Sequence, residues 1–199
     1  MRGRPSQGFW SEAALRSVGG YALLAVMATG LTFGLRDGVP WTHPDPWLVA
    51  PIGVALASST MLGLTAALAI IGFTRVVVRR FAWAQRLHAE LRPVARDLTD
   101  GQILLVAALS GIGEEVFFRG LLAPVVGVVI AALVFGLAHQ LKMRGAMGWV
   151  WTSWATVVGL MLGSIFALTG SLVGPLLAHA VVNAVNLSYL RDNEAAYVG

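Results

Sequence analysis

Long apolar runs separated by short polar stretches make up most of this chain of 199 residues. A membrane-spanning helix needs roughly 20 predominantly apolar residues. Six segments approach that length, and they predict transmembrane helices at about Val18–Leu35, Leu48–Phe73, Gln102–Phe118, Val125–Leu141, Met147–Leu168 and Leu172–Leu190. The fourth segment is short for a span, and we expect it to be tilted or partly buried in protein. The pattern therefore predicts an all-α polytopic transmembrane helix bundle that forms one domain over residues 1–199.

Basic residues between these segments predict the orientation of the bundle, because cytoplasmic loops carry an excess of Lys and Arg. The loop after the first segment has only Arg36, beside Asp37 and Asp45. The other loops and the N-terminal region hold Arg2, Arg4, Arg16, Arg75, Arg79, Arg80, Arg86, Arg92, Arg96, Lys142, Arg144 and Arg191. Six spans put both termini on the side of these basic loops, so both termini are expected in the cytoplasm.

Composition supports a membrane protein and excludes several other classes. The chain is 57% hydrophobic and only 12% charged, with a mean hydropathy of +0.74, whereas a soluble domain is about a quarter charged. The formal net charge is +4, but no aromatic-interleaved basic surface indicates nucleic acid. The expected partner on this ground is the lipid bilayer. The absence of cysteine excludes disulfides, thiolate metal sites and a cysteine nucleophile.

Two further segments each allow two interpretations. RVVVRRFAWAQRLHAELRPVAR, residues 75–96, has helical character and is either a cytoplasmic connector whose charge sets topology or an amphipathic helix on anionic lipid. In the second interpretation Phe81, Trp83, Leu87 and Leu91 would lie in the headgroup layer. Gly159 and Gly163 form GLMLG, a small-xxx-small pattern that favours close helix packing within the monomer over a dimer interface.

Three ionisable residues interrupt an otherwise apolar stretch at SGIGEEVFFRG, residues 110–120. Each such group costs about 3 kcal/mol at mid-helix unless it is paired or reached by water. Glu115 and Arg119 are four residues apart, acid first, which suits an ion pair on one helical face. Glu114 is turned about 100° from that face, so it needs a different partner.

Polar candidates for that partner occur in later spans. His139 ends FGLAH, and His179 and Asn183 lie four residues apart in HAVVN on one face of the last span. One such residue alone would be explained by an interhelical hydrogen bond, worth about 0.6 kcal/mol. Six polar residues over three helices favour a polar intramembrane cavity. The predicted span limits leave Glu114 and His139 some 10 Å apart in depth, at about 1.5 Å of rise per residue.

This set of residues supports more than one chemistry. A carboxylate beside a neutral imidazole can take a proton from water, and a second histidine with an amide can donate to an oxyanion. Glu114, His139 and His179 could instead bind zinc, although the chain has no HExxH. A proton-coupled carrier would also use Glu and His in its spans. Serine catalysis is less supported, because no serine has an evident histidine-plus-acid arrangement.

The three motifs carry a family resemblance. EEVFFR matches EExxxR, FGLAH matches FxxxH and HAVVN matches HxxxN, in that order along the hydrophobic chain. Together they resemble the CPBP (Abi) family, which includes type II CAAX prenyl endopeptidases and bacterial intramembrane glutamic proteases. The resemblance is close over residues 110–186, within a motif-bearing core at 102–190, and the first hundred residues match only as generic spans.

The resemblance implies a role for each motif residue. Glu114 and His139 would activate the attacking water, His179 and Asn183 would form the oxyanion hole, and Glu115 and Arg119 would hold the geometry of the site. The implied enzyme needs no metal or other cofactor.

The function that follows is an intramembrane endopeptidase of a bacterial inner membrane. It would cleave near the C-terminus of a membrane-anchored or lipidated protein, with sorting proteases of the myxosortase type among its relatives. Two other classes stay open: a non-catalytic binding or bacteriocin-immunity protein, and a proton-coupled transporter.

Overall fold

The computed structural model describes residues 12–36, 38–140 and 145–194, and the regular structure in this part of the chain is helical. Arg2, Arg4, Lys142 and Arg144, used above for orientation, lie outside the described residues, as does the side chain of Arg16. The elements are α1 (Glu12–Arg36), α2 (Ile52–Arg80), α3 (Ala82–Ala95), α4 (Asp100–Glu114), the π-helix η1 (Glu115–Leu122), α5 (Ala123–Val126), α6 (Val128–Gln140), α7 (Gly145–Thr169) and α8 (Val173–Asp192).

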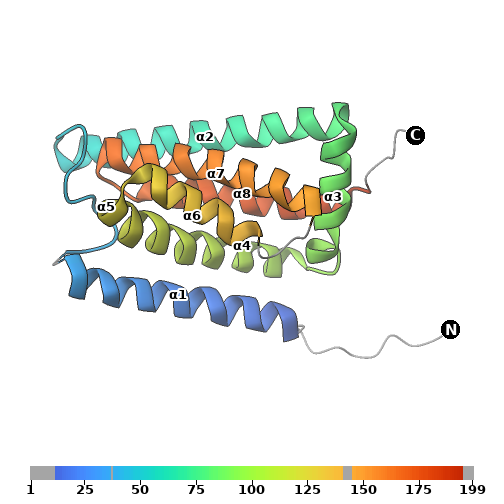
Figure 1. Cartoon of the computed structure of the whole chain (residues 1–199), viewed down its shortest axis with the longest axis horizontal. Helices are drawn as coiled ribbons and strands as arrows, with labels where there is room; N and C mark the ends of the chain where they lie inside the picture. Colours follow the sequence, from blue (N-terminus) through green and yellow to red (C-terminus); the bar gives the residue numbers. More distant parts are fainter. Residues whose placement is uncertain (1–11, 37, 141–144, 195–199) are drawn as a thin grey trace.

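The long helices run alternately up and down a shared axis (Figure 1). Helix α3 stands across the end of the bundle at which α1 begins and α8 ends. At the opposite end, the loop after α1 meets the turn between α7 and α8, where the backbone N–H of His43 donates to the carbonyl of Gly170 at 2.9 Å. The start of α1 and the end of α8 therefore lie at the same end of the bundle.

Five of the six predicted segments form helices long and apolar enough to span a membrane, and the fourth does not. Helix α6 has 13 residues, about 20 Å at 1.5 Å per residue, against a hydrocarbon core of about 30 Å. The third segment is longer than predicted, because helical structure continues from Asp100 to Val126. It stops at Gly127, whose φ of 88° lies in the left-handed region that favours glycine.

These limits correct the depth mismatch expected from the sequence. Glu114 lies near the middle of the helical stretch Asp100–Val126 and not in its outer half. His139 lies at the end of α6, which stops short of the end of the bundle where α3 lies (Figure 1). Both residues line the same pocket of the bundle.

The segment at residues 75–96 divides between two helices. Its first part completes α2, and its second part is α3, which packs against α8 through a T-shaped contact between the rings of His88 and Tyr189. Phe81 and Trp83 are exposed, but Leu87 is buried. The headgroup-layer interpretation is therefore wrong for Leu87.

Small residues let the helices approach closely. Gly159 faces Phe135 and Ala132 of α6, and Gly163 faces Val128 of the same helix. The GLMLG pattern therefore serves packing within the monomer, as predicted. Helices α2 and α8 meet at Gly63 and Gly174, where Ser59 also donates to the carbonyl of Ser171 at 2.8 Å.

Replacing Gly63 with alanine is expected to destabilise the bundle by about 1–3 kcal/mol through overpacking, because the new Cβ would overlap the backbone of Gly174. Gly72 on the same helix is a matched control, since a Cβ there meets open space. Thermal unfolding of the two detergent-solubilised variants measures the difference. A melting temperature lowered equally in both would contradict the α2–α8 contact.

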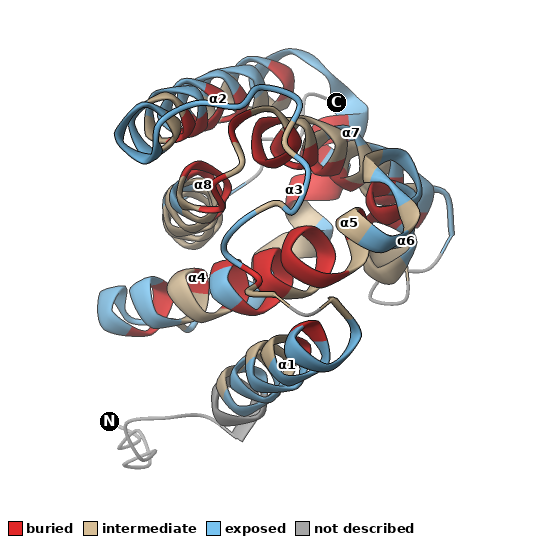
Figure 2. Cartoon of the chain, turned by 90° about the vertical axis from the view of Figure 1, so that its left-hand side faces the viewer, coloured by how far each residue is buried: buried red, intermediate tan, exposed pale blue. Residues whose placement is uncertain are grey.

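The outer surface of the bundle is apolar. Large hydrophobic side chains such as Val26 and Leu35 on α1, and Ile52 and Leu68 on α2, are exposed, and exposed residues cover the outer faces of both helices (Figure 2). Apolar patches of this extent mark contact with a membrane or partner. With five helices of spanning length, they make this chain an integral membrane protein.

Candidate active site

A π-helical turn carries the buried acids. Glu114 ends α4, and Glu115 begins the π-helix η1. Such π segments are rare in proteins, and those that occur are often found at functional sites. Two glycines bring this stretch against its surroundings: Gly113 lies against the backbone of Tyr21 on α1, and Gly120 lies against Pro40.

Glu115 and Arg119 form the ion pair that their spacing predicts. Nη1 of Arg119 donates to Oε1 of Glu115 at 2.8 Å, and the two residues are 2% and 0% exposed. Arg119 also donates to the carbonyl of Gly159 at 3.3 Å and lies over the ring of Phe135, 4.5 Å from its centroid. Such a buried pair is expensive to break, because removing one partner leaves an uncompensated charge.

His179 lies between the two glutamates. Its Nδ1 is 2.7 Å from Oε1 of Glu115, and its Nε2 is 3.7 Å from Oε2 of Glu114. An ionised carboxylate can only accept, so Nδ1–H is the donor to Glu115. Glu115 thereby orients His179 as well as Arg119, and it turns the other ring nitrogen toward Glu114.

Each of the two acids leaves one carboxylate oxygen without a hydrogen bond, and Glu114 is the one of the two that lines the pocket. The residue is 6% exposed, and its Oε2 has no hydrogen-bond partner among the described residues; the same holds for Oε2 of Glu115. A buried oxygen of this kind is costly unless another group satisfies it, and Nε2 of His179 lies 3.7 Å from Oε2 of Glu114.

His139 is held by its own helix. Its Nδ1 lies 2.8 Å from the carbonyl oxygen of Phe135, one turn earlier. A carbonyl only accepts, so this bond places the proton on Nδ1 and the basic lone pair on Nε2. The ring packs against Phe135 and Trp151, with centroid distances of 4.6 and 5.7 Å.

Asn183 comes from α8, one turn after His179. Its Nδ2 donates to Oγ of Ser110 at 2.9 Å, and Ser110 donates in turn to the carbonyl of Ala107. This bond uses one N–H of the carboxamide and fixes its orientation. The second N–H of Nδ2 is left to donate to another group. Asn183, like His179, lines the pocket.

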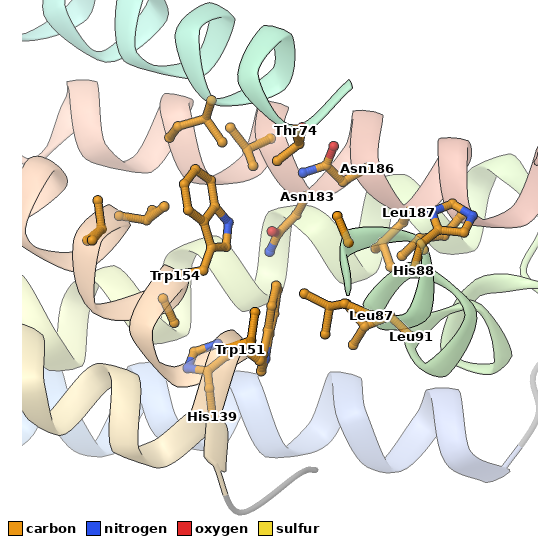
Figure 3. A pocket seen from close by; sticks show the side chains of 18 of the residues that line it. Thr74, Leu87, His88, Leu91, His139, Trp151, Trp154, Asn183, Asn186 and Leu187 are labelled. Atoms are coloured by element: carbon orange, nitrogen blue, oxygen red, sulfur yellow. The ribbon is translucent and has the colours of Figure 1, made fainter. Parts of the chain in front are cut away.

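Glu114, His139, His179 and Asn183 line one pocket, which has a volume of about 960 Å³. Figure 3 shows His139 and Trp151 on one side of it, Asn183 and Asn186 on α8, and Leu87, His88 and Leu91 of α3 at its far end. The lining is predominantly apolar. The expected polar cavity is thus not what the structure shows: it is an apolar pocket to which the motif side chains contribute polar atoms.

The six predicted site residues are brought together, but two important neighbours were not singled out. Phe135 contacts Arg119, His139 and His179, with a T-shaped 6.2 Å ring contact to the last. The phenylalanine of FxxxH was the available signal for it. Ser110 precedes the acids by one turn, and nothing in its local pattern indicates the bond to Asn183.

The described residues contain no group of three His, Cys, Asp or Glu arranged to hold a metal ion.

Fold and site define a helical integral membrane protein with acids and imidazoles beside a pocket in its interior. Residues 100–185 match the family model described as type II CAAX prenyl endopeptidase Rce1-like, a range that contains all six motif residues. The resemblance of the motifs to the CPBP family is therefore confirmed over residues 100–185, which match its Rce1-like model. The first 99 residues lie outside the match.

One curated relative is the uncharacterized protein YpbD of Bacillus subtilis (strain 168), which is 30% identical over 89 residues. The alignment covers 45% of this chain and 46% of YpbD, so the chain spans about half the length of that relative. No solved structure matches the chain at a significant level.

Proposed function

We propose that this protein is an intramembrane endopeptidase that hydrolyses a peptide bond near the C-terminus of a membrane-anchored or lipidated protein, with a water molecule activated by Glu114 and His139. The observation that carries the proposal is Glu114, which lines the pocket with a buried Oε2 that has no hydrogen-bond partner among the described residues. The Rce1-like match supports proteolysis over transport or passive binding. The protein would work in a bacterial inner membrane with both termini in the cytoplasm.

The first step is proton removal from water. Glu114 accepts the proton while its Oε2 orients the water, and the Nε2 lone pair of His139 assists. The water oxygen then forms a bond to the scissile carbonyl carbon, and the carbonyl oxygen becomes an oxyanion. In the second step the C–N bond breaks, and the proton held by Glu114 moves to the departing nitrogen.

The oxyanion would be stabilised from α8. The second N–H of the Asn183 carboxamide is one donor on that helix. Nε2 of His179 is the other when the ring carries a proton on both nitrogens, since Nδ1–H is already given to Glu115. Glu115 fixes His179 through Nδ1, and Arg119 compensates the charge of Glu115. In this account Glu115 and Arg119 act only by positioning and contribute no proton.

Envelope proteomics of a deletion strain tests the proposal. We expect at least one membrane protein to retain a C-terminal segment that the parent strain removes, and expression of the wild-type chain to restore removal. A complete set of unchanged C-termini in the deletion strain would favour a non-catalytic protein.

Asn183→Ala is expected to lower kcat by about 10²–10³, as for loss of one oxyanion donor. Substrate affinity should change little, because the donor acts on charge that develops only in the transition state. Steady-state kinetics of the reconstituted variant separates the two effects. Normal kcat with a raised KM would instead give Asn183 a role in recognition.

Chelation separates the water-activation mechanism from a zinc mechanism. In a zinc site Glu114 would be a ligand and could not act as the base, and Asn183 would have no clear task. We expect cleavage to survive prolonged treatment with a strong chelator and the purified protein to hold less than one zinc per chain by elemental mass spectrometry. Activity lost to the chelator and restored by zinc would overturn the glutamate mechanism.

A further inference from the structure

A second polar group lies in the pocket, away from the motif residues, and it is built around Arg75 of α2. Nη1 of Arg75 donates to Oδ1 of Asn186 at 2.9 Å, and Nη2 donates to the carbonyl of Val185 at 3.1 Å. The guanidinium lies over the ring of Tyr189, 3.8 Å from its centroid. Arg75, Asn186 and Tyr189 all line the pocket, and we call these three residues the Arg75 corner.

Arg75 has no carboxylate partner among the described residues. Other arginines do: Arg119 pairs with Glu115, and Arg191 pairs with Asp100 and Asp192. The partners of Arg75 are an amide, a carbonyl and an aromatic ring, all neutral. A half-buried cation without a counter-charge is unfavourable, so the corner is suited to accept an anion. The acids that share the pocket lining are Glu90, an exposed side chain of α3, and Glu114 among the motif residues.

The corner has further hydrogen-bond donors to give. Oδ1 of Asn186 accepts from Arg75, which turns the Nδ2 group of the same carboxamide away from the guanidinium with two N–H bonds to give. A planar guanidinium and an adjacent amide N–H suit the two oxygens of a carboxylate. The corner therefore matches a carboxylate better than a neutral end.

Helix α8 connects this corner to the motif residues. His179, Asn183 and Asn186 are spaced four and three residues apart, which places them on one face of the helix, and Figure 3 shows Asn183 and Asn186 next to each other. Seven residues separate His179 from Asn186, about 10 Å of rise. An extended peptide covers that distance in about three residues at 3.3 Å each.

We propose that the Arg75 corner is a carboxylate subsite that binds the free C-terminus of the substrate about three residues beyond the bond that is cut. The proposal rests on the proposed function, and it adds the recognition element that selects chain ends over internal segments. The departing part of the substrate would run along α8 from Asn183 toward the end of the bundle where α3 lies.

The experiment compares one peptide in two forms, an N-decanoylated Leu-Val-Leu-Leu with a free carboxylate and the same peptide as a C-terminal amide. The full chain is placed in phosphatidylcholine nanodiscs, and affinity is measured from the fluorescence of the tryptophans, several of which line the pocket. We expect the acid to bind about tenfold more tightly than the amide, a typical value for one charge-assisted contact. Arg75→Gln should reduce this ratio to about one.

Two further variants separate recognition from helix fastening. Arg79→Gln makes the same change of charge one turn away at an exposed position outside the pocket, and it should keep the preference for the acid. Asn186→Asp keeps the link between α2 and α8 as an ion pair but fills the corner with a carboxylate, so it should abolish the preference without lowering the melting temperature.

Equal affinity of the wild-type protein for acid and amide would overturn the proposal, as would a preference that survives both Arg75→Gln and Asn186→Asp. Arg75-dependent binding of phosphatidylglycerol, with no preference between the peptides, would assign the corner to lipid and also overturn it. An Arg75-dependent acid preference in a protein that cleaves nothing would support the subsite and count against the proposed protease.

Discussion

Glu114→Gln is expected to abolish detectable cleavage while the protein stays folded. Loss of a general base typically costs about 10²–10⁴ in rate, and here the same carboxylate also orients the water. Glutamine fills nearly the same volume, and Oε2 of Glu114 has no protein hydrogen bond to lose among the described residues. Cleavage of the substrate found by proteomics, measured with purified protein in proteoliposomes, gives the rate.

Thermal unfolding of the same preparation provides the control. The melting temperature of Glu114→Gln should match that of the wild type, because its partner His179 is 3.7 Å away and is held independently by Glu115. A variant that cleaves at the wild-type rate would remove Glu114 from the mechanism. A variant that is inactive because it unfolds would give Glu114 a structural task instead.

Glu115→Gln is expected to destabilise the protein by about 3–5 kcal/mol, the usual cost of removing one partner of a buried ion pair. Glu115 is fully buried and accepts hydrogen bonds from both Arg119 and His179. The substitution leaves the guanidinium without its carboxylate in a region of low dielectric constant. Activity should fall as well, since the charged acceptor that fixes the orientation of His179 is replaced by a neutral amide.

The two neighbouring acids are expected to differ in their contribution to stability. Both substitutions remove one negative charge, but only Glu115→Gln should lower the melting temperature. Adding Arg119→Met to Glu115→Gln should recover part of the stability, because the uncompensated charge is removed, without restoring cleavage. Equal melting temperatures for Glu114→Gln and Glu115→Gln would contradict this division of roles.

Local sequence pattern predicted the features of this molecule that depend on near neighbours. The Glu115–Arg119 pair follows from a spacing of four residues, and the placement of His179 and Asn183 on one face follows from the helical period. Five spans were recovered because each is a long apolar run. The order of the three motifs along the chain predicted that their helices share one site. The pattern within a single helix could not predict this.

Features that depend on tertiary packing were missed. Apolar residues continue across the Gly127 break, so hydropathy alone placed one helix end too early and lengthened the next helix. The bond from Asn183 to Ser110 joins residues 73 positions apart, and the bond from Arg75 to Asn186 joins residues 111 apart. The sequence read Arg75 only as a charge that sets topology, whereas the folded chain places it inside the pocket.

Isotope incorporation tests the central claim most directly, namely that Glu114 activates water to cleave a peptide bond without a covalent intermediate or a metal. The reconstituted protein is incubated with its substrate in ¹⁸O-labelled water, with chelator present, and the new C-terminus is analysed by mass spectrometry under single-turnover conditions. The account predicts one ¹⁸O in the new carboxylate for the wild type and no product for Glu114→Gln. Product without ¹⁸O, or labelled product formed equally well by Glu114→Gln, would contradict it.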